Sequence, residues 1–125
     1  MKSLLIVALG GAAGSMLRYL CQLGIKNQFP TTFPLGTFLV NVSGCFLIGL
    51  FYGIAGRYAW LNQEWRLLLI TGVCGGYTTF SSYSFEAIDL LRQGNYGNFA
   101  AYVGLSVLLG LGAVFGGIAL VQRGS

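Results

Sequence analysis

Hydroxyl and aromatic side chains cluster at residues 75–84, which read G-G-Y-T-T-F-S-S-Y-S. They lie in an uncharged segment, residues 67–85, that is long enough to cross a hydrocarbon core of about 30 Å. Two glycines followed by threonines and serines disfavour an unbroken helix. Lipid tolerates irregular backbone only where it is buried in protein or lines a water-filled cavity. We therefore predict a third helix broken at mid-membrane, where freed carbonyl groups could hold a cation and hydroxyls could line a polar path.

The composition predicts an integral membrane protein and disfavours an enzyme. Of the 125 residues, 55% are hydrophobic and 8% are charged, against about 25% charged residues in soluble domains. Histidine is absent, and the basic residues are too scattered to form a nucleic-acid-binding patch. The three cysteines lack the spacing of a metal or redox motif, so we interpret them as packing residues: Cys21, Cys45 and Cys74.

The hydrophobic segments predict one all-α domain, residues 1–125, with four transmembrane helices. The expected spans are about 3–25, 35–56, 64–92 with a break near 75–79, and 98–121. The first could instead be a signal peptide, but three further spans favour a transmembrane helix. Asn62 is the expected N-cap of the third span, with Glu64 in its first turn, and Gly94 is expected to stop that span.

The charges flanking the four spans are nearly balanced. One side would carry Lys2, Arg57, Arg66 and Arg123, and the other side Arg18, Lys26 and Arg92. Because the lysine and arginine bias of short loops sets orientation, such a chain is expected to insert both ways up. Two opposed copies would meet across an axis in the membrane plane. We expect an antiparallel homodimer.

Several polar residues inside the spans need partners. Asn41 lies about 9 Å into the second span, where its amide either ties helices together or donates to an anion. Arg18 either snorkels to the headgroups or lines a vestibule that attracts anions. Phe80 and Tyr83 share a helix face, which more often marks a core than a site. A polar edge continues this face, and a second row one turn apart follows the fourth span: Thr79, Tyr83 and Glu86, then Tyr102, Ser106 and Gly110.

The glycines predict close helix contacts. A stripe of Cys45, Gly49 and Gly53 on the second span indicates packing, and so do Gly112 and Gly116 on the fourth span. The Gly10–Gly14 pair is too common a pattern in glycine-rich helices to carry weight.

At these motifs the chain resembles the Fluc (CrcB) family of fluoride channels. The resemblance rests on G-S-M-L-R at 14–18, G-T-F-L-V-N at 36–41 and the run at 75–84, and order and spacing agree over essentially the full length. It implies a dual-topology homodimer with two antiparallel pores and a central structural sodium ion. It also implies passive export of cytoplasmic fluoride through a bacterial inner membrane, and so fluoride resistance.

The resemblance also implies residue roles. The carbonyls of Gly75 and Thr78 would hold sodium. The fluoride pore would use the amide of Asn41, the ring edge of Phe80 and a polar track, with Arg18 as the vestibule cation. The remaining pore residues implied are Thr79, Tyr83, Tyr102 and Ser106. The chain departs from the family where Tyr83 replaces the usual phenylalanine, Ser82 the usual threonine and Gly110 a frequent serine; we expect permeation to be retained.

Two other classes of protein share some of these features with a channel. A small multidrug-type proton-coupled antiporter is also a four-helix antiparallel dimer, but it needs a membrane-embedded carboxylate in the first helix, which has none. A non-transporting assembly protein would explain the glycines but leaves a broken third helix without a purpose.

Overall fold

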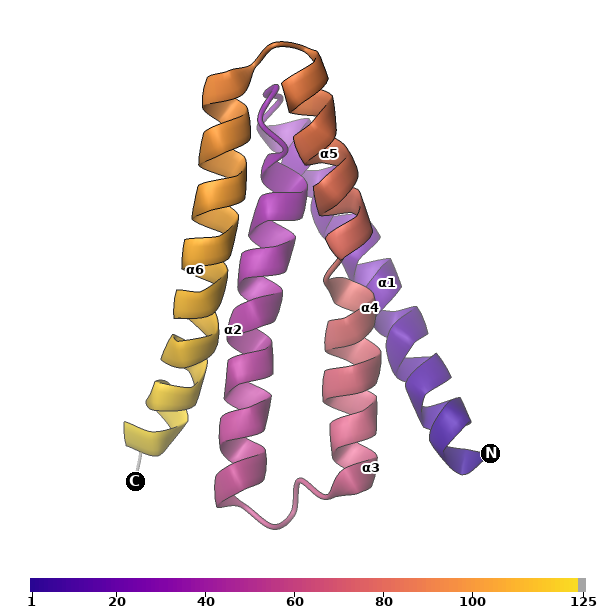
Figure 1. Ribbon diagram of the computed structural model, residues 1–125. Helices are drawn as coiled ribbons and strands as arrows, with labels where there is room; N and C mark the ends of the chain where they lie inside the picture. The colour runs from indigo at the N-terminus through magenta and orange to yellow at the C-terminus, as the bar shows by residue number, and fades with distance from the viewer. Residues whose placement is uncertain (124–125) are drawn as a thin grey trace.

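The computed structural model describes residues 1–123, whose regular elements are all helices. They are α1 (Lys2–Gln28), α2 (Leu35–Arg57), α3 (Gln63–Arg66), η1 (Leu67–Cys74), α4 (Gly75–Tyr77), α5 (Phe80–Arg92) and α6 (Tyr96–Arg123). α1, α2 and α6 each make one pass along the molecule, and α3, η1, α4 and α5 follow one another to make the third pass, between α2 and α6 in the chain (Figure 1). The passes converge at the end that holds the α1–α2 loop and spread at the other end, where α1 begins and α6 ends (Figure 1).

Within residues 1–123, three helices are long and apolar enough to cross a membrane, namely α1, α2 and α6. Their bounds extend slightly beyond the expected spans. α1 continues to Gln28, since Pro30 is the first residue that opposes a helix after it. α6 begins at Tyr96, two residues before the expected start at 98. The third pass is divided among shorter helices.

The third pass begins and ends as the sequence predicts. The Asn62 side-chain oxygen accepts hydrogen bonds from the backbone N–H of Glu64 at 3.1 Å and of Trp65 at 3.3 Å, so the N-cap prediction is confirmed. Gly94 has φ of 77°, a left-handed conformation that glycine adopts without steric cost and that commonly ends helices.

Between these ends the helix is interrupted at two threonines. α4 ends at Tyr77, and Thr78 and Thr79 have extended backbone, with ψ of 159° and 124°. The side chain of Thr79 then caps α5 by accepting a hydrogen bond from the Ser82 N–H at 3.1 Å. The glycines Gly75 and Gly76 stay helical. The prediction that these glycines help to break the helix is therefore wrong. The helix is interrupted at β-branched residues, one of which caps the next helix.

The glycines of α1 bring the first and third passes into backbone contact. A Cβ atom on Gly10 would lie 2.9 Å from the Cα of Gly72 in η1. One on Gly14 would overlap the carbonyl oxygen of Val73, and one on Gly76 would lie 2.5 Å from the Gly11 carbonyl oxygen. The prediction that the Gly10–Gly14 pair carries no structural weight was therefore wrong, because this pair forms the surface on which η1 and α4 pack.

A second set of glycines joins α2 to α6. A Cβ atom on Gly49 would overlap the Val114 carbonyl oxygen, and one on Gly53 would lie 3.2 Å from the Val121 Cβ. The packing predicted for this stripe is therefore confirmed. Gly112 and Gly116 have no atom within 4 Å of such a position, so the contact predicted for them is wrong within the described chain. Their part is taken by Gly117, which faces the Phe46 carbonyl oxygen.

Candidate functional site

The interruption is held by the side chain of Asn41. Its Nδ2 donates to the Thr79 carbonyl oxygen, and its Oδ1 accepts from the Thr79 N–H, both at 2.9 Å. The amide therefore pairs with the extended backbone as a neighbouring strand would. A side-chain amide has two N–H donors, so this pairing leaves Asn41 with a second one.

Several carbonyl groups lose their helical donors at the interruption, among them those of Gly75 and Thr78. In a continuous α-helix the Thr79 N–H would donate to the Gly75 oxygen and the Ser82 N–H to the Thr78 oxygen. Here the first N–H donates to Asn41 Oδ1 and the second to Thr79 Oγ1. Gly75 is also exposed on this single chain. Released main-chain oxygens suit a hard cation, which prefers oxygen ligands. No cluster of three His, Cys, Asp or Glu residues occurs in residues 1–123 to offer another metal site.

Aromatic rings lead away from the interruption along α5 and α6. The ring centroids of Phe80 and Tyr83 lie 5.9 Å apart, and those of Tyr83 and Tyr102 lie 5.0 Å apart. Tyr102 is fully buried, and its hydroxyl donates to Glu86 Oε1 at 3.3 Å. Phe80 is 79% exposed. The row therefore runs from a bare ring at the surface to a buried hydroxyl at a carboxylate.

Ser106 lies one turn beyond Tyr102 on α6 and has an unused hydroxyl. Its Oγ is buried, yet it has no hydrogen-bond partner in the described part of the chain. Buried polar atoms are nearly always paired with protein or ordered water. The Ser106 hydroxyl is therefore available to a water molecule or an ion.

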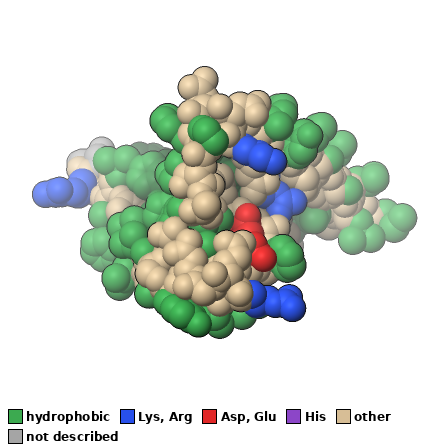
Figure 2. All heavy atoms as spheres, turned by 90° about the horizontal axis from the view of Figure 1, so that it is seen from above, with side chains coloured by type: hydrophobic (Ala, Val, Ile, Leu, Met, Phe, Trp, Pro, Cys, Tyr) green, Lys and Arg blue, Asp and Glu red, His purple; other side chains and the backbone are tan. Residues whose placement is uncertain are grey.

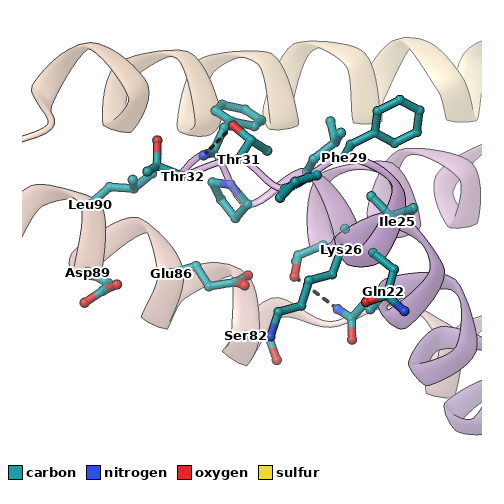
Figure 3. A pocket seen from close by; sticks show the side chains of 17 residues that line it. Gln22, Ile25, Lys26, Phe29, Thr31, Thr32, Ser82, Glu86, Asp89 and Leu90 are labelled. Carbon is teal, nitrogen blue, oxygen red and sulfur yellow. Dashed lines mark hydrogen bonds between the residues drawn. The ribbon is translucent and has the colours of Figure 1, made fainter.

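A cavity of about 730 Å³ opens where the helices converge, between the α1–α2 loop and α5. Gln22 and the buried Thr37 join across it, with Gln22 Nε2 donating to Thr37 Oγ1 at 3.1 Å. Glu86 and Asp89 line its α5 wall, and Lys26 lines it from α1 (Figure 3). From this end, acidic side chains lie near the centre with lysine and arginine around them (Figure 2).

The structure brings together most of the candidate residues. Asn41 contacts Thr79 directly, and the rings of Phe80, Tyr83 and Tyr102 form one row. Arg18 is half-buried on α1 and does not line the cavity. The basic residue of the cavity is Lys26 instead.

Gln22 and Thr37 line the cavity, but neither is among the candidate residues that the sequence indicated. Thr37 belongs to the G-T-F-L-V-N motif and could have been noticed there. Gln22 depends on how α1 crosses α2, and the sequence carries no signal for that.

These features define a class of protein: a multi-pass helical membrane protein with an interrupted third pass and polar side chains around it. Residues 5–118 match the family model described as CrcB-like protein, Camphor Resistance (CrcB). The chain belongs to this family.

Similar proteins carry one name over nearly their whole length. A protein of Phocaeicola vulgatus named "Fluoride-specific ion channel FluC" is 50% identical, over 94% of this chain and 97% of its own. Proteins of the same name from Flavobacterium psychrophilum and Leptospira interrogans are 45% and 43% identical. Each covers 98% of this chain, and the chain covers 99% and 96% of them in turn.

Proposed function

We propose that this protein is a fluoride-selective channel that lets cytoplasmic fluoride leave the cell passively, down its electrochemical gradient. The observation that carries this most strongly is 50% identity over nearly the full length of a relative named as a fluoride-specific ion channel. The membrane would be the plasma membrane, the inner membrane in a bacterium with two.

The site chemistry supports an anion path. Fluoride is small and strongly hydrated, so it passes only where donors replace its water without holding it too tightly. The second N–H of Asn41 and the edge hydrogens of Phe80 and Tyr83 would be such groups. The Tyr102 hydroxyl would join them by turning its proton from Glu86, to which it now donates, toward the ion. The unpartnered Ser106 hydroxyl and Thr79 would complete the track.

The bare surface around the interruption supports a dimer. Phe80 is 79% exposed, and Gly75, whose carbonyl has lost its helical donor, is exposed as well. In the proposed antiparallel homodimer a second chain covers this surface and completes two pores. The carbonyls of Gly75 and Thr78 from both chains would hold a central sodium ion. Four main-chain oxygens fit sodium better than magnesium, which keeps its waters and demands near-octahedral geometry.

Arg18 is proposed as the cation of a vestibule that two chains of the dimer form together. Arg18 does not line the cavity at Lys26 of its own chain, so the vestibule that it would serve is one formed together with the opposed chain. A positive charge near the pore mouth raises the local concentration of an anion.

Flux from liposomes tests the proposed function. Purified protein should release fluoride when a potassium ionophore balances charge, and release chloride at least tenfold more slowly. Phe80→Ala should slow the fluoride release, while Phe115→Ala, at an equally exposed ring of α6, should leave it unchanged. Comparable chloride release, or fluoride release that requires a proton gradient, would refute a passive fluoride channel.

A further inference from the structure

A second side-chain contact holds the interruption, at Tyr77, on the other side of Thr78 from the Asn41–Thr79 pair. Tyr77 is the last residue of α4, and its hydroxyl lies 3.0 Å from Ser43 Oγ on α2. The same hydroxyl lies 3.8 Å from Cys21 Sγ on α1, and its one proton can go either to this sulfur or to Ser43 Oγ, which also lies 3.1 Å from the Val40 oxygen. One phenol therefore links the residue before the interruption to two other passes.

The Asn41–Thr79 pair and the Ser43–Tyr77 contact lie on either side of one glycine. On a helix that turns about 100° per residue, Gly44 lies between Asn41 and Ser43 around the circumference. A Cβ atom on Gly44 would overlap Thr78 Cγ2 and would lie 3.2 Å from Tyr77 Cδ2. The extended chain therefore crosses α2 at Gly44. Asn41 holds Thr79 on one side, and Ser43 holds Tyr77 on the other.

Thr78 lies between these two points, and its own donors point elsewhere. Its N–H donates to the Cys74 oxygen at 3.0 Å, and its hydroxyl to the same oxygen at 2.9 Å. Its carbonyl direction therefore depends on how Tyr77 and Thr79 are held. With the Asn41 pair alone, the segment could pivot about that pair and take the amide of Asn41 with it.

We infer that Tyr77 is a positioning residue, whose hydroxyl, held by Ser43, fixes the interruption so that Asn41 and the Thr78 carbonyl keep their orientation. The inference rests on the proposed function for its effect on conduction. Its effect on the backbone stands independently. Conduction should be sensitive to this hydroxyl although it does not line the row of rings.

Removal of the hydroxyl tests the role. Tyr77→Phe keeps the ring against Gly44, and Ser43→Ala removes the partner. Each should lower the fluoride rate per dimer about fivefold, the factor that one ordinary hydrogen bond supplies. Both together should cost no more than either alone. Ser43→Thr keeps a hydroxyl and should retain the parent rate, and so should Tyr52→Phe, at an exposed tyrosine of the same helix.

Two readouts separate positioning from folding. At low protein-to-lipid ratio, the fraction of liposomes that release fluoride counts folded dimers, and the rate in those liposomes gives the rate per dimer. Loss of folding lowers the first quantity alone. Amide exchange at Thr79, whose N–H donates to Asn41, should quicken about fivefold in Tyr77→Phe. If the parent releases fluoride, an unchanged rate per dimer in Tyr77→Phe overturns the inference. If the parent releases none, the proposed function fails, and Thr79 exchange decides: faster exchange upholds the positioning role, and unchanged exchange overturns it.

Discussion

At the scale of single residues, Asn41 has the helix-joining role that its position in the sequence left open, and it keeps a donor for the role proposed above. Its Oδ1 and one N–H tie α2 to the Thr79 backbone, which is a helix-joining role. The second N–H is the donor proposed for fluoride. Position alone could not separate these roles, because the extended backbone at Thr79 takes up only one of the two N–H donors of the amide.

Asn41→Asp should abolish most fluoride flux. The carboxylate would place an oxygen where Nδ2 now donates to the Thr79 carbonyl, so two acceptors would face each other. An unmatched buried group of this kind costs about 1–3 kcal/mol, and a negative charge would also repel the anion. We expect at least a tenfold lower rate per dimer in liposomes. Asn98→Asp, in the first turn of α6, is the matched control and should conduct as the parent does. Normal flux in Asn41→Asp would remove Asn41 from the site.

Individual side chains were predictable to the extent that they follow helical spacing. The contact between Phe80 and Tyr83 follows from their three-residue separation and is seen at 5.9 Å. The position of Tyr102 and Ser106 on one face of α6 was likewise predictable, because they are one turn apart. The Gln22–Thr37 hydrogen bond joins residues 15 positions apart across a loop. That contact depends on a crossing of two helices that no local pattern specifies.

At the scale of elements, glycines decide which helices touch. Gly49→Ala should destabilise the fold, because the added methyl would overlap the Val114 carbonyl of α6. Overpacking of this kind costs about 1–3 kcal/mol. Gly112→Ala, on an open face of α6, should be neutral or slightly stabilising, since alanine favours helix. Denaturation in detergent micelles would measure both, and equal stability of the two variants would contradict this account of α2–α6 packing.

The third pass marks the limit of what the sequence predicts about elements. Its caps were predictable from Asn62 and Gly94, whose chemistry is local. The interruption falls within the expected range, but at Thr78 and Thr79 rather than at the glycines. Gly76 instead allows α4 to approach Gly11. The π-helix η1 was not anticipated, since hydropathy does not distinguish i→i+5 from i→i+4 hydrogen bonding.

At the scale of the whole molecule, the single chain leaves its site open. Phe80 is 79% exposed, and Gly75 is exposed as well. The nearly balanced charges of the two ends permit the opposed insertion that an antiparallel partner requires. The homodimer proposed above would cover this exposed surface with a second chain.

Removing sodium should weaken the assembly. If the carbonyls of Gly75 and Thr78 from two chains meet at one cation, then purification in a large organic cation leaves four oxygens facing each other without a charge between them. We expect the dimer to dissociate faster and the fluoride rate to fall, with recovery on return of sodium. Thr78→Ser keeps both the carbonyl and the hydroxyl that donates to Cys74. It should therefore retain the same sodium dependence, because main-chain oxygens do the binding. Dimer lifetime and flux that are equal with and without sodium would contradict a structural ion at the centre.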